Sequence, residues 1–448
     1  MSVGGLARAT VNSLPGVNLG PGEGELPSAS IADNVAFNAL VVVPNALQGL
    51  FRRRRGPVGA ATRADVDRWA VRLLRGMHRA HGGSPVWVRL GTSPALLLLD
   101  TDDVRRMLEG SPDPFASDPE AKRKGMAHFQ PDALTISRQP EWGNRRPFNE
   151  SVLASGDAAR PLAERVTGVV SDEVGALLAD AGGEVEWGRW STAFRRIARR
   201  IVLGDAARED EELSDLLAGL MDEANSLPDE PSPELETYLE RIETYVNAGE
   251  EGGLVARFAQ APQNAETKPA RQVTHWLFAM GDTLAINSLR ALAAIAAHPE
   301  ALARAGSGDD AYTGACLEEA MRLRPSTPLL SRDTVRETDW RGVAVAKGTQ
   351  LVIVNTYMHR DPDRHEFSDR FAPEVWIDGN AADDWAFNHL SHGPQGCPGA
   401  GLVLLVGKVA LAAVIDGRSV ELVEPRIDPT KPLPHMLDFF SIRVSAGA

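Results

Sequence analysis

Hydrophobic side chains recur at helical spacing along most of the chain. In residues 64–79 this spacing predicts one amphipathic helix, whose apolar positions are Val66, Trp69, Ala70, Leu73 and Leu74. From residue 142 to residue 305 the pattern is helical almost throughout, with breaks at 182–183, 228–233 and 262–264. A further helix is predicted over residues 311–323. Helices therefore dominate the predicted fold.

Strand patterns are fewer and shorter. Residues 86–88 and 95–99 are apolar and flank a Gly-Thr-Ser turn at 91–93, which predicts a β-hairpin. Residues 351–354 also have the composition of a strand. Roughly 25 residues without a regular pattern then precede His389. Segments of this kind are unusual inside compact domains and tend to be functional.

The two ends of the chain differ in character. The first 60 residues are rich in Gly and Pro and weakly periodic, which predicts a loosely wrapped arm. Residues 400–415 are apolar on nearly every side, so that helix should be deeply buried. We expect a mainly α fold with a minor β portion, made of an arm over residues 1–60 and a single catalytic domain over residues 61–448.

Residues 35–51 are apolar and are followed by four arginines, as in a membrane anchor. Asn38, Pro44, Asn45 and Gln48 interrupt this run, which is shorter than the span of about 20 residues that a membrane helix needs. We expect a buried or surface-lying helix here and no stable membrane anchor.

Charge is concentrated in one part of the chain. The sequence has 47 basic and 61 acidic residues, for a formal charge of −14. Residues 209–251 contain fifteen acidic residues and one basic residue, so they account for the whole imbalance. This segment is either a pair of solvated helix faces or an acidic lid that repels anionic ligands. A nucleic-acid partner is not expected, because the chain has no basic stripe.

The chain has two cysteines, Cys316 and Cys397, too few for a disulfide framework. With no secretory signal at its start, the sequence is expected in the reducing cytoplasm. Cys316 falls on an apolar helix face and is interpreted as an inert core thiol.

Cys397 lies in a turn of glycines and prolines directly before the apolar helix at 400–415. Backbone N–H groups and the helix dipole would both lower the pKa of a thiol there. Glycine lets the backbone lie flat against a broad, planar group, because no Cβ intervenes. The segment therefore favours a sulfur that carries negative charge beside such a group.

Three kinds of site compete for this segment. A phosphate loop is disfavoured, since residues 401–408 have the wrong glycine spacing and no hydroxyl after the lysine. A zinc site could use His389, His392 and Cys397, but it lacks a fourth ligand. A haem iron needs only one strong axial thiolate, so haem fits best.

Residues 390–401 resemble the haem-binding loop of the cytochrome P450 family, FxxGx[R/H]xCxG. Gly393, Cys397 and Gly399 match that motif, which implies that Cys397 is the axial ligand of haem b. Leu390 stands where the family usually has Phe and keeps an apolar plug near the sulfur. Gln395 stands where the family has the Arg or His that meets a haem propionate, so pairing there should be weaker.

Residues 319–325 resemble the family's ExxR helix, in which Glu319 and Arg322 share a helix face and form a buried pair that locks the Cys loop. The family's third partner is the arginine of a downstream PxRF motif, and here Val375 occupies that place. Arg332 stands where a family arginine binds a propionate.

Residues 276–285 resemble the family's oxygen-groove motif, [A/G]Gx[D/E]T[T/S]. The resemblance implies that Asp282 and Thr283 deliver protons to bound oxygen. Met280 replaces the usual Gly and Leu284 the second hydroxyl, so the width of the groove is open. The residues by themselves would also allow an N-cap at a helix kink.

Trp142 and Arg146 have a WxxxR spacing that places both on one helix face. An indole N–H and a guanidinium can each donate to a carboxylate, as haem propionates require. Arg145 competes with Arg146 for this role.

The resemblance implies the triangular, mainly α prism of the cytochrome P450 family and a haem-thiolate monooxygenase that inserts one oxygen atom from O2 into an apolar small molecule. Its pocket walls should include residues 111–137, 278–287, 326–331 and 436–440. Electrons should come from a separate ferredoxin and its reductase, because no flavin or ferredoxin module fits in the remaining sequence. An H2O2-driven peroxygenase and a non-catalytic haem sensor or carrier are the alternatives.

Overall fold

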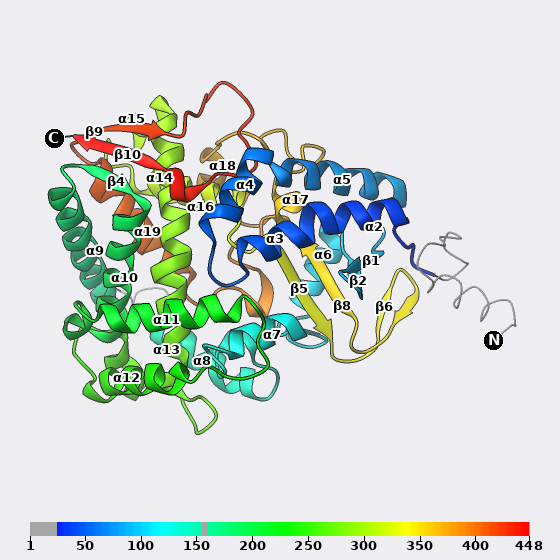
Figure 1. The fold of residues 1–448 in the computed structure, drawn as a ribbon, viewed down its shortest axis with the longest axis horizontal. Helices are drawn as coiled ribbons and strands as arrows, with labels where there is room; N and C mark the ends of the chain where they lie inside the picture. Colours follow the sequence, from blue (N-terminus) through cyan, green and yellow to red (C-terminus); the bar gives the residue numbers. More distant parts are fainter. Residues whose placement is uncertain (1–24, 154–159, 448) are drawn as a thin grey trace, which may run out of the picture.

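The computed structural model describes residues 25–153 and 160–447. Helices form one half of the molecule and a small sheet with its covering helices forms the other (Figure 1). Each half has its own apolar core, one among the helices and one between the sheet and the N-terminal helices. The structure confirms the predicted mainly α class with a minor β portion.

The sheet has five strands in the order β1-β2-β8-β5-β3. Strands β1 (Val86–Leu90) and β2 (Ser93–Leu97) form the predicted antiparallel hairpin. Strand β8 (Gln350–Val354) confirms the strand pattern at 351–354 and runs parallel to β2. The other strands are β3 (Phe115–Ala116), β4 (Glu184–Glu186), β5 (Leu329–Thr334), β6 (Thr338–Trp340), β7 (Val343–Val345), β9 (Ser419–Glu424) and β10 (Arg443–Gly447).

Helices within residues 31–109 contribute to the core beside the sheet, and helices within residues 141–248 contribute to the core of the helical half (Figure 1). The helices before the oxygen-groove motif are α2 (Ile31–Phe37), α3 (Val43–Gln48), α4 (Arg55–Ala64), α5 (Val66–His81), α6 (Thr101–Glu109), α7 (Glu120–Ala127), α8 (Glu141–Leu153), α9 (Arg160–Asp180), α10 (Trp187–Leu203), α11 (Glu211–Ala224) and α12 (Glu234–Ala248). The breaks predicted near residues 182 and 228–233 fall between these helices. 

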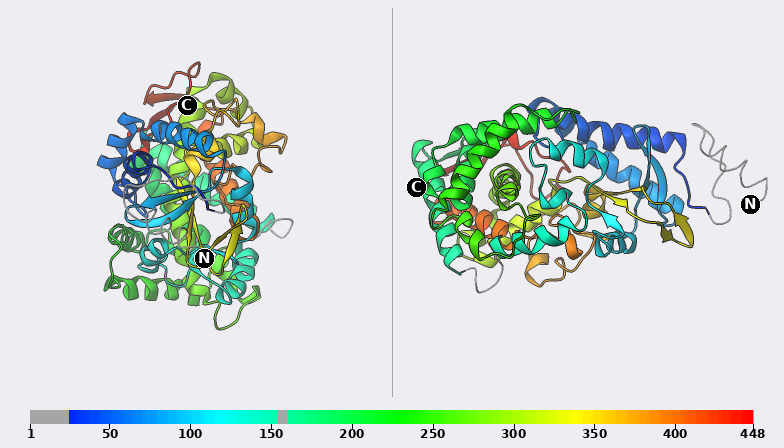
Figure 2. Two further views of the ribbon diagram at one scale, coloured as in Figure 1. Left: turned by 90° about the vertical axis from the view of Figure 1, so that its right-hand side faces the viewer. Right: turned by 90° about the horizontal axis from the view of Figure 1, so that it is seen from below.

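Later helices complete the bundle. They are α13 (Pro269–Phe278), α14 (Ala285–Ala297), α15 (Pro299–Ala305), α16 (Asp310–Leu323), α17 (Asn355–Arg360), α18 (Glu374–Ile377) and α19 (Ala400–Ile415). A π-helix, η6 (Ala279–Leu284), joins α13 to α14. In Figure 2 this long helix is seen nearly end-on and is surrounded by other helices. It is the central element of the helical half.

The N-terminal arm is more ordered than its sequence pattern predicts. Residues 1–24 lie outside the described part of the chain, but α2, a short π-helix at Asn38–Val42 and α3 occupy residues 31–48. These helices lie on the surface, with Val35 and Leu47 exposed, which explains the weak periodicity. Helix α4 continues across residue 60, where the arm was expected to end.

Among residues 25–153 and 160–447, no helix has the length and apolar character that a membrane span requires.

Two sequence predictions about helix burial are wrong in part. In α5, Ala70 and Leu74 are buried, but Trp69 is 50% exposed and lies under the Arg72 guanidinium, so its place on the predicted apolar face is wrong. Helix α19 has the predicted bounds and packs against α9 and α16, but it is buried along one face only and the rest of it is half-buried, so the predicted deep burial on all sides is wrong. At Gly407 a Cβ would lie 2.4 Å from Leu317 Cδ2, so the close approach of α19 to α16 requires glycine.

The acidic segment at 209–251 forms α11, α12 and their flanking turns. Several of its carboxylates bind bases: Asp210 pairs with Arg241 at 2.8 Å and Glu211 with Arg199 at 2.9 Å. Some of the acidic residues predicted to lie on solvated helix faces therefore form ion pairs that hold α11 and α12 in place.

A buried ion pair lies where α16 meets the segment before the Cys loop. Glu319 and Arg322 are both fully buried, and two hydrogen bonds of 2.6 and 2.7 Å join their side chains. Arg322 also donates to backbone carbonyls of His359, Ser368 and Arg370. One guanidinium thus fixes a segment that has little secondary structure of its own.

Trp376 supplies the third partner that Val375 cannot. Its indole Nε1 donates to Glu319 Oε2 at 2.9 Å, and the Ala372 N–H donates to Oε1 at 2.9 Å. Its ring also lies edge-on against His389, 5.1 Å away, at the start of the Cys loop. Trp376 therefore connects the buried ion pair to that loop.

We predict that Trp376→Phe lowers the free energy of unfolding by about 2 kcal/mol, because a buried carboxylate loses one donor while the ring remains. Thermal and urea denaturation would measure the change. Trp385→Phe is the matched control, since the Trp385 indole N–H donates to no described residue and its ring contacts His392 instead. Equal losses in the two variants would contradict the role of the Trp376 N–H.

Candidate active site

The Cys397 loop is closed by its own backbone. The Cys397 N–H donates to the Leu390 carbonyl at 2.8 Å, and the Gly396 N–H donates to the Gly393 carbonyl at 2.9 Å. Gly393 has a φ of +68°, and a Cβ there would lie 2.5 Å from the Leu108 carbonyl oxygen. The loop can rest against the end of α6 only because this residue is glycine. Leu390 packs on the helical core, as expected for an apolar plug.

The Cys397 side chain is half-buried. Protein atoms surround the Cys397 sulfur on most sides, and part of the side chain remains exposed. Burial raises the pKa of the Cys397 thiol, while the Gly399 N–H and the charge of Arg146 lower it. The predicted net lowering of this pKa is therefore wrong for the protein alone, because burial outweighs the two favourable contacts. A thiolate here needs a bound cation, and haem iron would supply one.

Arg146 lies beside the Cys loop. Its Nη1 donates to the Gly396 carbonyl at 2.6 Å and its Nε to Glu150 at 2.7 Å. Arg145 is buried and committed elsewhere, with Asp132 at 3.1 Å and Ser137 Oγ at 2.8 Å. The structure thus places Arg146, and not Arg145, near the sulfur, while Trp142 is half-buried on the same helix.

Arg332 and Gln395 come from distant parts of the chain and meet the segment of residues 111–117. Arg332 is 3% exposed and its Nε donates to Ser111 Oγ at 3.2 Å. Gln395 Nε2 donates to Ser117 Oγ at 3.1 Å, and its Oε1 is buried without a partner.

Lys122 joins this group and was not predicted. Its Nζ donates to the carbonyls of Ser117 and Thr135, at 2.9 and 2.8 Å. Burial and the nearby charge of Arg332 lower the pKa of Lys122 to about 7, and burial lowers that of Arg332 to about 10.

The residues present fit a haem. Arg332 is buried and Lys122 is half-buried, they lie close enough to repel each other, and neither forms an ion pair with an acid in the described residues, although Asp118 acts on Lys122 from farther away. Such a pair of cations is costly to desolvate, and a pair of carboxylates would stabilise it. Haem carries two such propionates. Lys122, Arg332 and Gln395 could hold them while Cys397 binds the iron.

The oxygen-groove motif coincides with the π-helix η6. A π-turn has one residue more than an α-turn, and such segments occur at functional sites. Asp282 and Thr283 are both within η6 and both half-buried. Burial raises the pKa of Asp282 and Arg195 lowers it. The alternative interpretation of this motif, an N-cap at a helix kink, does not occur, because the helix continues on both sides of η6.

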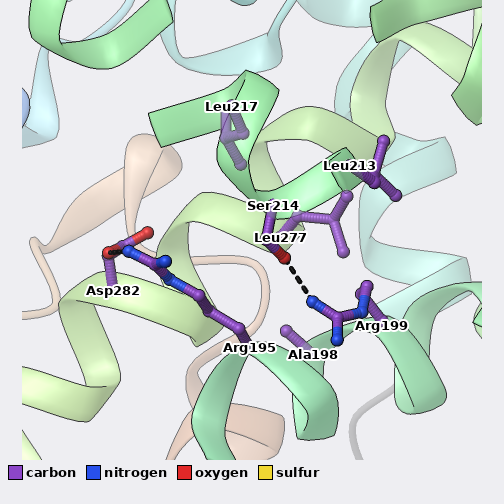
Figure 3. A pocket seen from close by; sticks show the side chains of 8 residues that line it. All are labelled: Arg195, Ala198, Arg199, Leu213, Ser214, Leu217, Leu277 and Asp282. Atoms are coloured by element: carbon purple, nitrogen blue, oxygen red, sulfur yellow. Dashed lines mark hydrogen bonds and ion pairs between the residues drawn. The ribbon is translucent and has the colours of Figure 1, made fainter. Parts of the chain in front are cut away.

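Arg195, on α10, is the residue that reaches Asp282. Its Nη2 lies 3.4 Å from Asp282 Oδ1. Figure 3 shows both side chains in a small pocket where α10, α11 and η6 meet, with Ser214 and Arg199 hydrogen-bonded on the other side. No local sequence signal pointed to Arg195, which is 87 residues from its partner.

The remaining candidates have other roles. His392 bonds the Phe387 carbonyl and His389 contacts Trp376, and within residues 25–153 and 160–447 no three His, Cys, Asp or Glu side chains gather as metal ligands. Nothing in this part of the chain supports the zinc alternative. Cys316 is fully buried and burial raises the pKa of its thiol, which agrees with an inert core residue.

Comparison with known proteins gives matches over the C-terminal part of the chain. Residues 311–439 match the family described as Cytochrome P450. Cytochrome P450 4c3 of Drosophila melanogaster is 29% identical over 124 residues, which are 27% of this chain and 23% of the relative. Cytochrome P450 4V2 of Homo sapiens is 31% identical over 106 residues, 23% of this chain and 20% of the relative. The chain therefore matches only about a quarter or less of the length of these curated relatives.

The similarity in fold to a solved structure covers most of the chain. A solved complex of P450BioI with an acyl carrier protein ligated to hexadec-9Z-enoic acid matches with a TM-score of 0.65 at 16% sequence identity. The match covers 84% of this chain and 96% of that one. Family match, curated relatives and fold agree with the Cys397 loop and its surrounding cations. Residues 311–439 therefore match the cytochrome P450 family, most of the chain shares the fold of a solved cytochrome P450, and haem is the cofactor that its site fits.

Proposed function

We propose that this protein is a haem-thiolate monooxygenase that inserts one oxygen atom of O2 into an apolar small molecule. The observation that supports the proposal is the presence, in one chain of this fold, of a closed single-cysteine loop and of an Asp-Thr pair within a π-helix. A bound haem would supply the iron that binds and reduces O2. The chain would supply the axial thiolate of Cys397, the proton path and the pocket walls.

Asp282 and Thr283 are proposed to move protons to the reacting oxygen. A carboxylate reloads with protons only if it can change its charge state, and here burial and Arg195 act on its pKa in opposite directions. The pocket in Figure 3 lies on the Arg195 side of Asp282 and offers polar groups toward α11. Arg195 is therefore proposed as a positioning residue for Asp282.

Electrons are proposed to come from a ferredoxin and its reductase, docking on the Cys397 side, and the protein is proposed to act in the cytoplasm. Residues 111–137, 278–287, 326–331 and 436–440 are proposed as the walls of the substrate pocket. The division of the chain at residue 60 also stays a prediction.

We predict that the reduced, CO-treated protein shows a thiolate-type Soret band, which Cys397→Ala abolishes. Cys316→Ala is the matched control, because that thiol is buried in the core and away from the loop. Absorption spectra of equal amounts of folded protein would decide. A band that survives Cys397→Ala would remove the basis of the proposal.

We predict that removing Arg195 moves the acid limb of the pH–rate profile to higher pH. Arg195 lowers the pKa of Asp282, so Arg195→Met should raise that pKa further. The active carboxylate form is present above its pKa and is lost as the pH falls through it, so the loss begins at higher pH in the variant.

Steady-state oxidation rates across pH, with a saturating electron donor, would measure the shift. Asp282→Asn should remove this limb and slow turnover by about a hundredfold. Arg189→Met is the control, since that arginine lies on the same helix but is exposed and meets Glu184. If Arg195→Met and Arg189→Met give the same profile, Arg195 does not act on Asp282.

A further inference from the structure

The N-terminal helices carry an apolar surface that no described residue covers. Residues 31–48 form α2, the π-helix at Asn38–Val42 and α3, which run along the outside of the sheet half beside α5 (Figure 1). Of the eight large hydrophobic side chains that are exposed in the described part of the chain, five lie within residues 31–50. They are Ile31, Val35, Val43, Leu47 and Leu50, with exposed fractions from 46% to 65%.

These helices are apolar on two opposite sides. Phe37 and Val41 are buried in the core beside the sheet. On the outer side, every exposed residue between 31 and 50 is Ala, Val, Leu or Ile. The outer side of a surface helix is normally polar, and a helix that is apolar all round is normally covered all round. The outer side therefore has the composition of a covered surface.

The polar side chains of the same helices are bonded within the protein. The Asn34 side chain accepts a hydrogen bond from the Arg89 N–H at 2.8 Å, and Asn38 donates to the Arg89 carbonyl at 2.9 Å. The Gln48 side chain is buried and donates to the Pro44 carbonyl at 3.0 Å. The polar residues that interrupt the apolar run in the sequence therefore do not interrupt the exposed surface.

The π-turn keeps the exposed side chains on one side. Ile31, Val35, Val43 and Leu47 follow one another at intervals of four or eight residues. At about 100° per residue, a continuous α-helix would rotate this row by about 160° between Ile31 and Leu47. The additional residue of the π-turn takes back about 100° of that rotation, so the row stays within about 60°. The result is one continuous apolar stripe over residues 31–50.

Positive charge adjoins the apolar stripe. Residues 52–79 contain nine arginines and two acids in a chain whose formal charge is −14. Arg54 and Arg55 directly follow the stripe, are exposed, and form no ion pair among the described residues. Trp69 is exposed on α5, which packs against α2. An anionic surface would attract this region and repel the acidic remainder of the chain, which would orient the molecule.

An anionic lipid bilayer fits this combination better than a second copy of the chain. Helices that lie in the bilayer interface combine a wide apolar side with basic residues, and Trp is enriched at that depth. The energetic centre of a protein interface is usually built from Trp, Tyr and Arg, whereas the stripe is wholly aliphatic. A second copy would also bring together two segments of the same positive charge, which repel each other.

We propose that the stripe over residues 31–50 binds the surface of an anionic lipid bilayer, with α2 and α3 lying in the plane of the interface. Arg54 and Arg55 would meet lipid phosphates at the end of the stripe. Such a contact is peripheral and reversible, unlike a spanning anchor. It uses neither the Cys397 loop nor the Asp282 pocket, so it stands independently of the proposed monooxygenase function.

The test uses the holoenzyme with vesicles of phosphatidylcholine alone and vesicles of phosphatidylcholine mixed equally with phosphatidylglycerol. Cosedimentation over a range of lipid concentrations measures the partition coefficient. Val35→Asp and Leu47→Asp each place a charge in the stripe, and Val423→Asp is the matched control at an exposed valine on β9. Arg54→Gln removes one positive charge, and its control is Arg426→Gln at another exposed arginine.

The wild-type protein should bind the anionic vesicles about tenfold more tightly than the neutral ones, and added salt should remove most of this difference. Val35→Asp and Leu47→Asp should each weaken binding about tenfold, whereas Val423→Asp should leave it unchanged. Arg54→Gln should weaken binding to the anionic vesicles alone, by about fivefold, and Arg426→Gln should not. If one aspartate variant does not fold, the other and Arg54→Gln still test the stripe.

Equal binding to the two kinds of vesicle would overturn the proposal, as would aspartate variants that bind as tightly as the Val423→Asp control. Sedimentation velocity without lipid tests the other occupant. A dimer that Val35→Asp dissociates, in a protein that does not bind vesicles, would assign the stripe to contact between two copies and overturn the lipid assignment.

Discussion

The buried Glu319–Arg322 pair is the interaction on which the cofactor side of the molecule depends. Two opposite charges with no access to water are stable only when every hydrogen-bonding position is used. Here backbone carbonyls from the 359–370 segment, one amide and the Trp376 indole complete the set. The pair therefore gives a fixed position to a long segment that has only short helices, and the Cys397 loop follows directly from it.

Elsewhere the molecule holds partly or fully buried cations that form no ion pair within 4 Å among the described residues. Lys122 and Arg332 lie near the Cys loop, and Arg53, Arg290 and Arg324 line a pocket beside residues 435–439. Desolvation of these cations costs free energy in both places. The first group fits the propionates of haem.

Features set by nearby residues were predictable from the sequence. The hairpin, the bounds of α19 and the position of the Cys397 loop depend on patterns within a few residues. A surface-lying helix within residues 35–51 was predicted and is confirmed, but the rest of the arm was interpreted as loosely wrapped because its exposed apolar residues hide the periodicity. Trp376, Lys122 and Arg195 were missed because each acts on a partner that only the folded chain brings near. The direction of the Cys397 pKa was wrong because burial, which the sequence does not give, outweighs the local contacts.

The π-helix η6 has a geometric effect beyond the residues it contains. One additional residue in a turn rotates everything after it by about 100° relative to a continuous α-helix. Helices α13 and α14 therefore present side chains with different phases, although they share one axis. Arg290 on α14 can reach the pocket beside residues 435–439 while Asp282 faces α10. Deleting a single residue within 279–284 would turn one of these two side chains away from its present neighbours, so the length of this segment is as constrained as its composition.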